Sequence, residues 1–247
     1  MTLAKVLRLS LSIFLLGAPL LLAGDEDPPR HKRPYFGIRF DYNTLPFFHT
    51  GVAASSTSVP AADYWYSATS HTPRFTVAPT VEFRLPHRLS LAAELDFRHL
   101  AYQQNTLIQS GTFTYPDNRN TISIQQTAKI NAWEVPILAR YTGFRARGWF
   151  SRVYLTGGLA YRHFGRIRSG TQYQYPDGST DYNENAPVPS LVNQIGAVGG
   201  LGLRLKAPFD VLFIPEVRYT RWRGVALQGT AFNSTANQLE GGIGFSF

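Results

Sequence analysis

Residues 35–43 read Tyr-Phe-Gly-Ile-Arg-Phe-Asp-Tyr-Asn, and the alternation in this stretch decides the fold. The even positions from Phe36 to Tyr42 are apolar, whereas Arg39 and Asp41 lie at odd positions. A period of two puts the two classes on opposite faces of an extended strand. Seven later segments repeat the pattern: 74–85, 89–99, 130–141, 152–164, 194–205, 211–220 and 237–247. Their lengths suit tilted strands that cross a bilayer, which need about 9–11 residues.

The connections between these segments alternate in length. Residues 86–88 alone join the second segment to the third, and residues 206–210 join the sixth to the seventh, while the link at 142–151 is somewhat longer. The other links are long and rich in Ser, Thr, Asn, Gln, Gly and Tyr. Short turns at one end and long polar loops at the other are typical of outer-membrane barrels. The sequence therefore predicts an all-β fold, an eight-stranded antiparallel up-and-down transmembrane β-barrel over residues 35–247, with long extracellular loops and short periplasmic turns.

The N-terminal residues have the features of an export signal. In the chain of 247 residues, Lys5 and Arg8 precede an apolar run at 9–22 and the small residues Ala23 and Gly24. An uncleaved membrane anchor is the alternative, but the run is shorter than the roughly 20 residues of a spanning helix. We expect a cleavable signal peptide at 1–23 and a flexible leader at 24–34. The chain has no Cys, which excludes disulfides, thiolate metal sites and thiol nucleophiles.

The charged residues on the polar faces of the predicted strands form a balanced set. Every base among them is Arg rather than Lys. The set comprises Arg39, Asp41, Glu82, Arg84, Glu94, Asp96, Arg98, Glu134, Arg140, Arg162, Arg204, Glu216, Arg218 and Glu240. Paired charges of this kind fit a closed interior, and side chains fill the interior of an eight-stranded barrel. The sequence thus predicts an ion-pair network in the lumen, with ordinary solvated surface charge as the alternative.

Three prolines disagree with the strand pattern. Pro79, Pro136 and Pro215 lie inside predicted strands, although proline lacks the N–H that a strand ladder needs. Bulges or local bends would accommodate them. Otherwise the predicted boundaries near these residues are wrong.

Two short motifs resemble known barrel families. The terminal stretch at 238–247, Gln-Leu-Glu-Gly-Gly-Ile-Gly-Phe-Ser-Phe, resembles the C-terminal strand signal of Gram-negative outer-membrane barrels. Residues 133–141, Trp-Glu-Val-Pro-Ile-Leu-Ala-Arg-Tyr, are similar to the E-x-P-x-x-x-x-Y strand of PorT-like barrels. The broader likeness is to OmpA-like and OmpX-like eight-stranded barrels. The resemblance implies that the barrel assembly machinery recognises Phe245 and Phe247 and that the cell outer membrane is the destination.

The sequence offers no convincing catalytic or metal-binding constellation. Small outer-membrane deacylases carry a His-x-Ser pair, and no His here has Ser two positions later. Convergence of His99, His163 and Asp63 has no support from spacing, and the His residues also lack metal-ligand spacing. We therefore expect no enzyme activity, no metal and no cofactor.

The leading hypothesis is a monomeric barrel that serves envelope integrity or loop-mediated surface contact. The Tyr-rich polar loops suit either recognition or packing on one another. A narrow passive pore is the alternative, and an outer-leaflet lipid-modifying enzyme is the third possibility. The expected partners are outer-membrane lipid and the barrel assembly machinery, with no nucleic acid. Lipopolysaccharide phosphates are the expected contacts of Arg166, Arg168, Arg221 and Arg223.

Overall fold

The computed structural model describes residues 34–58, 61–110, 121–142, 152–184, 192–206 and 211–247. The named regular elements in these ranges are all β-strands. They include no helix that is long and apolar enough to cross a membrane. The predicted signal at 1–23 and the leader up to residue 33 lie outside the described residues.

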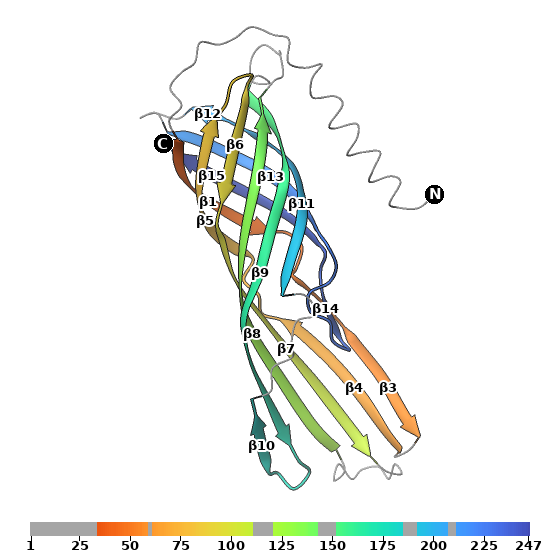
Figure 1. The fold of residues 1–247 in the computed structure, drawn as a ribbon. Coiled ribbons are helices and arrows are strands. Elements are labelled where there is room, and N and C mark those ends of the chain that lie inside the picture. Colours follow the sequence, from red (N-terminus) through yellow and green to blue (C-terminus); the bar gives the residue numbers. More distant parts are fainter. Residues whose placement is uncertain (1–33, 59–60, 111–120, 143–151, 185–191, 207–210) are drawn as a thin grey trace, which may run out of the picture.

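The strands form a sheet that closes on itself (Figure 1). In chain order they are β1 (Pro34–Asn43), β2 (Phe48–Thr50), β3 (Val52–Ser58), β4 (Ala61–Ser70), β5 (Phe75–Arg84), β6 (Leu89–Glu94), β7 (Asp96–Ser110), β8 (Thr121–Tyr141), β9 (Val153–Gln174), β10 (Thr180–Asn183), β11 (Asn193–Leu203), β12 (Leu205–Lys206), β13 (Leu212–Trp222), β14 (Phe232–Ser234) and β15 (Asn237–Ser246). The hydrogen-bonded order β9-β11-β13-β15-β1-β5-β6-β8 returns to β9. Neighbouring strands run antiparallel, so the predicted eight-stranded antiparallel barrel is confirmed.

The predicted and observed strands agree at the end of the barrel where the short turns lie, called the turn end below. Phe36 and Phe247 exchange backbone hydrogen bonds there, with N···O distances of 3.2 and 3.0 Å, and so join β1 to the C-terminal end of the chain. The turn between β5 and β6 uses a positive φ at His87 and at Arg88, of 62° and 63°. Such a compact connection holds neighbouring antiparallel strands in register.

Beyond the opposite end of the barrel, strands continue as an open sheet, called the distal sheet below (Figure 1). Its order is β3-β4-β7-β8-β9-β10. The barrel strands β8 and β9 extend outward, as does β7, which continues β6 after the break at Leu95, and added strands flank them. The long connections, predicted as polar loops, are therefore largely regular sheet. The start of β8, Thr-Ile-Ser-Ile at 121–124, shows why: β-branched residues favour strands, and β7 offers a partner ladder as far as Gln109.

Interruptions in the neighbouring strands accommodate two of the prolines. Pro136 lies opposite the break at Leu95 that separates β6 from β7. Pro215 lies opposite the break at Arg204, between β11 and β12. On β5, the carbonyl of Pro79 accepts a hydrogen bond from the Leu95 amide at 3.2 Å. The third proline therefore also lies beside the break at Leu95. Strand boundaries near the prolines therefore need little change.

Candidate functional site

Strand alternation delivers the predicted charged residues to the barrel interior. Twelve of them are buried: Arg39, Asp41, Glu82, Glu94, Asp96, Arg98, Glu134, Arg140, Arg162, Glu216, Arg218 and Glu240. Arg204 is half-buried near the turn end. The buried members come from β1, β5, β6, β7, β8, β9, β13 and β15, so every barrel strand except β11 contributes a charge to the interior.

The middle of the interior holds three guanidinium groups around three carboxylates, called the central cluster below. Its members are Arg39, Asp41, Glu94, Arg140, Glu216 and Arg218. Arg39 donates to Glu216 and to Asp41, both at 2.7 Å. Arg140 donates through Nη2 to Glu94 at 3.0 Å and to Glu216 at 3.1 Å. Arg218 donates to Glu94 at 2.6 Å and to Glu216 at 2.9 Å, so the two Glu side chains are shared between several Arg.

A second group, the distal cluster, lies closer to the distal sheet. Glu134 accepts from Arg162 at 2.7 Å and lies 2.8 Å from Nε of Arg98. Arg98 also pairs with Glu240. Gln238 joins the cluster by donating to Glu240 at 2.6 Å.

Neutral side chains add hydrogen bonds to both clusters. Gln238 accepts from the indole of Trp222 at 2.8 Å, and the guanidinium of Arg162 lies 3.7 Å from the Trp222 ring centroid. Tyr154 donates to Glu216 at 2.7 Å. The sequence interpretation missed these roles because it followed charge alone, although Gln238 occupies the same face as Glu240 in the period-two pattern.

The turn end of the interior holds a smaller set of contacts. Glu82 accepts from Arg140 at 2.7 Å and pairs with Arg204, which also donates to Ser90 at 2.8 Å. The prediction for Arg84 is wrong. Arg84 is exposed and its guanidinium lies 4.2 Å from the ring centroid of Tyr35, because β5 ends at Arg84 and the side chain has passed the rim.

Several predicted members of the network keep one buried side-chain atom without a hydrogen-bond partner. These atoms are Oδ1 of Asp96, Nη2 of Arg39 and Nε of Arg98, Arg140 and Arg204. Because Arg84 lies outside, the interior holds one more carboxyl group than guanidinium groups. Balance between Arg and acidic residues is therefore close but incomplete.

An apolar cluster, called the plug below, closes the barrel where it meets the distal sheet. It comprises Phe48, Ala68, Leu100, Tyr102, Ala128, Ile130, Ala132, Phe164, Ala226, Leu227, Ala231 and Phe232. The rings of Tyr102 and Phe232 have centroids 4.1 Å apart, and those of Phe48 and Tyr102 5.2 Å. Phe48 and Phe232 lie in the long connections, where β2 and β14 pair with each other. Two connections thus fold back over the mouth of the barrel.

The outward face of the barrel is apolar. Its exposed side chains include Phe36, Ile38, Phe40, Phe75, Val77, Phe83, Leu91, Leu95, Phe97, Trp133, Ile137, Leu155, Leu159, Tyr161, Ile195, Leu201, Val217, Tyr219, Ile243 and Phe245. Soluble monomers seldom expose apolar surface of this extent, and an apolar outer band is typical of membrane barrels.

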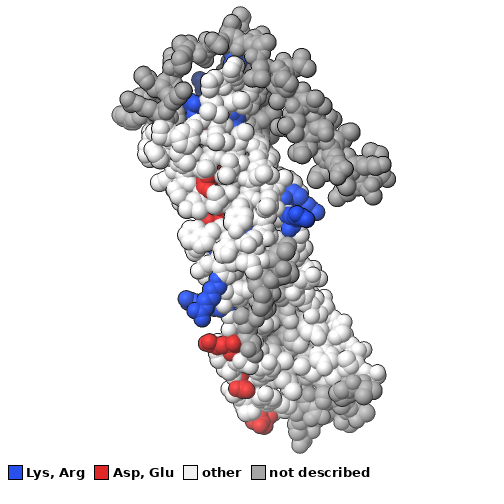
Figure 2. Space-filling model, viewed as in Figure 1, with Lys and Arg blue, Asp and Glu red and all other residues white. Residues whose placement is uncertain are grey.

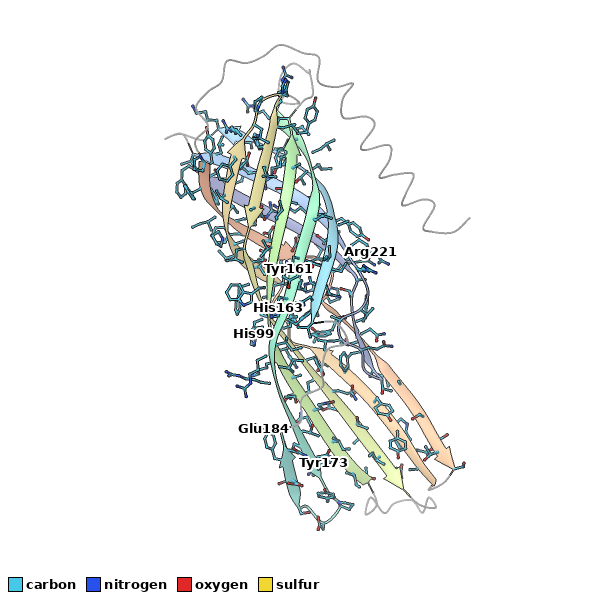
Figure 3. The ribbon with its side chains drawn as sticks, viewed as in Figure 1. His99, Tyr161, His163, Tyr173, Glu184 and Arg221 are labelled. Atoms are coloured by element: carbon cyan, nitrogen blue, oxygen red, sulfur yellow. The ribbon has the colours of Figure 1, made fainter. Side chains whose placement is uncertain are left out.

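A rim of paired polar side chains borders this band next to the distal sheet (Figure 3). Nδ1 of His99 lies 2.8 Å from Oδ1 of Asn131, and Nδ1 of His163 lies 2.7 Å from Oδ1 of Asn193. Tyr161 donates to the same Asn193 oxygen at 2.8 Å. Aromatic and polar groups of this kind mark the edge of a lipid-facing band.

The described residues contain no group of three or more His, Cys, Asp or Glu that would hold a metal ion. His99 and His163 lie on the outward face, and their hydrogen-bond partners are Asn side chains. Asp63 lies on β4, where its cross-strand partner is Gln109, far along the distal sheet. The three residues are thus not gathered into one site.

Comparison with protein-family models and with curated proteins finds no match. Among solved structures, the chain is similar to Neisserial surface protein A (NspA), with 12% sequence identity and a TM-score of 0.37. The match covers 86% of this chain and 95% of that chain. The barrel architecture rests on the strand pairing itself.

Proposed function

We propose that this chain is a non-enzymatic outer-membrane barrel protein that anchors the distal sheet at the cell surface for contacts with other molecules. In this proposal the turn end faces the periplasm and the distal sheet faces the exterior. The C-terminal strand, with Phe245 and Phe247, serves the barrel assembly machinery. Lipid surrounds the apolar band.

The observation that carries the proposal is the filled interior. The central and distal clusters occupy the lumen, and the plug closes its mouth. A cavity of about 90 Å³ lies beside Arg98 and Phe47. A space of that size holds about six to nine waters, because each needs roughly 10–15 Å³. The interior therefore favours a closed anchor over a narrow pore.

The distal sheet provides the surface for contact. Its face that continues the barrel interior carries Tyr64 and Tyr66, whose rings stack with centroids 6.2 Å apart. Gln104, Thr106 and Gln126 lie nearby along the same face. Tyr with small polar side chains gives adaptable contact surface at low entropic cost.

Two experiments test this proposal. In planar bilayers the purified protein should give no stable, repeated openings, and such openings would contradict the closed lumen. In cells lacking the protein, a variant with residues 104–126 replaced by a short turn should enter the outer membrane but fail to restore surface binding or adhesion. Full restoration by the shortened variant would overturn the role of the distal sheet. It would instead favour envelope integrity supplied by the barrel.

A further inference from the structure

Strand β9 changes face where it leaves the barrel. The ladder between β8 and β9 pairs Ala132 with Phe164 but Ile130 with Ile167, so β9 carries one extra residue. The extra position falls at Gly165 and Arg166. A β-bulge of this kind re-aims the side chains that follow it.

The bulge separates three arginines that a regular strand would hold on one face. Arg162, Arg166 and Arg168 share even numbers, so strict alternation would direct them all inward. Arg162 is 1% exposed and pairs with Glu134. After the bulge, Ile167 packs against the plug, and Arg168 faces outward and is exposed. Arg166, within the bulge, is also exposed.

Arg168 then meets a like charge on the neighbouring strand. Its cross-strand partner on β8 is Lys129, which is exposed on the same face. Like charges directly opposite each other destabilise a sheet pair. In the described part of the chain, none of Lys129, Arg166 and Arg168 forms an ion pair. An anion between them would relieve this repulsion.

The position of these residues along the strands brings their long side chains within reach of a lipid headgroup. Trp133, at the margin of the apolar band, pairs with His163, and Lys129 lies four residues further along β8. At about 3.4 Å per residue, Lys129 lies roughly 14 Å along the strand from Trp133, and less along the barrel axis because the strands tilt. Headgroup layers extend about 5–8 Å beyond the hydrocarbon on each side. Long Lys and Arg side chains reach back toward such a boundary.

Figure 2 shows the charge arrangement on this face of the molecule. Lys and Arg side chains lie near the junction of barrel and distal sheet and also near the other end of the barrel, and on the distal sheet itself acidic side chains lie toward the tip. The described acids of the β9–β10 hairpin are Asp177, Asp181 and Glu184. On the β8–β9–β10 part of the distal sheet, positive charge thus lies next to the barrel and negative charge lies nearer the tip.

We propose that Lys129, Arg166 and Arg168 form a binding site for the phosphate groups of a lipid in the outer leaflet. The planar guanidinium groups suit paired hydrogen bonds to phosphate, and the ammonium group of Lys129 adds a point charge. The bulge is the device that creates the site, because it supplies both Arg side chains to the lipid-facing side. This inference rests on the outer-membrane location in the proposed function.

Native mass spectrometry of the detergent-solubilised protein tests the site, with diphosphorylated lipid A as the probe and its dephosphorylated form for comparison. The triple variant K129Q/R166Q/R168Q should bind the phosphorylated lipid at least about tenfold more weakly than the wild type, since several charge-assisted contacts are lost. Binding of the dephosphorylated lipid should be equal for both proteins. The matched control R84Q/R88Q/R152Q removes the same charge from exposed positions near the turn end and should retain the lipid.

Equal binding by the wild type and the triple variant would overturn the site. An equal loss in the control would show nonspecific attraction by charge, and displacement of the lipid by millimolar inorganic phosphate would show a site for free anions; either result contradicts the proposal.

Amine labelling of the unmodified protein gives an independent check. Lipid A should slow the acetylation of Lys129 severalfold but leave Lys206 unchanged, and equal rates at Lys129 with and without lipid would also overturn the site. The planar-bilayer experiment tests the closed lumen of the proposed function, and its outcome does not depend on these lipid-binding results.

Discussion

Arg39 of β1 and Glu216 of β13 meet inside the barrel, with 2.7 Å between Nη1 and Oε2, although 177 positions separate them in the sequence. Strand β15 lies between β1 and β13 in the sheet, so this contact passes through the interior rather than along a strand ladder. Burial of a charge is costly unless an opposite charge and hydrogen bonds compensate it. The interior side chains therefore bind distant strands together in addition to the backbone hydrogen bonds.

Substitution of Glu216 should strongly destabilise the barrel. Glu216→Gln removes a charge that three guanidinium groups and Tyr154 contact, and an uncompensated buried charge costs about 3–5 kcal/mol. Urea unfolding of the protein in lipid vesicles measures the loss. The matched variant Glu184→Gln, at an exposed position, should stay within about 0.5 kcal/mol of the wild type. Equal unfolding midpoints for both variants would contradict the packed ionic interior.

Two adjacent glycines offer a test of close packing. A methyl group at Gly242 would overlap the Asp41 carboxylate and crowd Arg39, whereas one at Gly241 would meet nothing within 4 Å. Gly242→Ala should therefore cost about 1–3 kcal/mol through overpacking, and Gly241→Ala should cost less than Gly242→Ala. Thermal unfolding followed by heat-modifiable gel migration compares the pair. A larger loss from Gly241→Ala would refute the contact.

The plug should contribute stability without being the sole barrier in the lumen. Phe48 is 1% exposed, and Phe48→Ala leaves a cavity that should cost about 3–5 kcal/mol. Val52→Ala, at a side chain that is 81% exposed, is the control and should have little effect. Planar-bilayer recordings of Phe48→Ala should stay silent because the central and distal clusters remain. Steady conductance would show that the plug alone closes the lumen.

The β9–β10 hairpin should respond to acid through Asp177. The hydroxyl and the backbone amide of Ser179 donate to Oδ1 of Asp177 at 2.6 and 2.8 Å, and these hydrogen bonds lower the pKa of Asp177. Because the pKa is lowered, the ionised Asp177 carboxylate contributes fully to the stability of the hairpin above the ordinary Asp pKa of about 3.9. This contribution is lost as the pH falls through the lowered pKa. The Ser179 amide resonance should report this titration. In Asp177→Asn the same resonance should show no such step, and a midpoint at or above the ordinary value in the wild type would contradict the hydrogen bonds.

Period-two alternation predicted the barrel well because each barrel strand has one apolar and one polar face. The same rule placed Arg39 and Glu216 in the interior, but it failed for Arg84, where the strand ends at the rim. Alternation also cannot anticipate the bulge at 165–166, which moves Arg168 to the opposite face.

The plug and the distal sheet were beyond the reach of the sequence pattern. Phe48 and Phe232 lie in connections without extended periodicity, and the β2–β14 pairing brings them together. The polar composition of the distal extensions of β7 and β8 indicated loops. They form strands because each supplies the other with backbone hydrogen-bond partners, and a local pattern does not reveal such pairing. In both cases long-range pairing, rather than local preference, decides the structure.

Spin labelling tests most directly which face of the barrel meets lipid. The chain has no Cys, so Leu159→Cys and Leu201→Cys each give one label on the apolar band, and Val52→Cys gives one on the distal sheet. In reconstituted protein, we predict that the labels at 159 and 201 collide mainly with dissolved oxygen and the label at 52 mainly with a water-soluble nickel chelate. Collision of the labels at 159 and 201 with the nickel chelate, to the same degree as the label at 52, would contradict the membrane barrel.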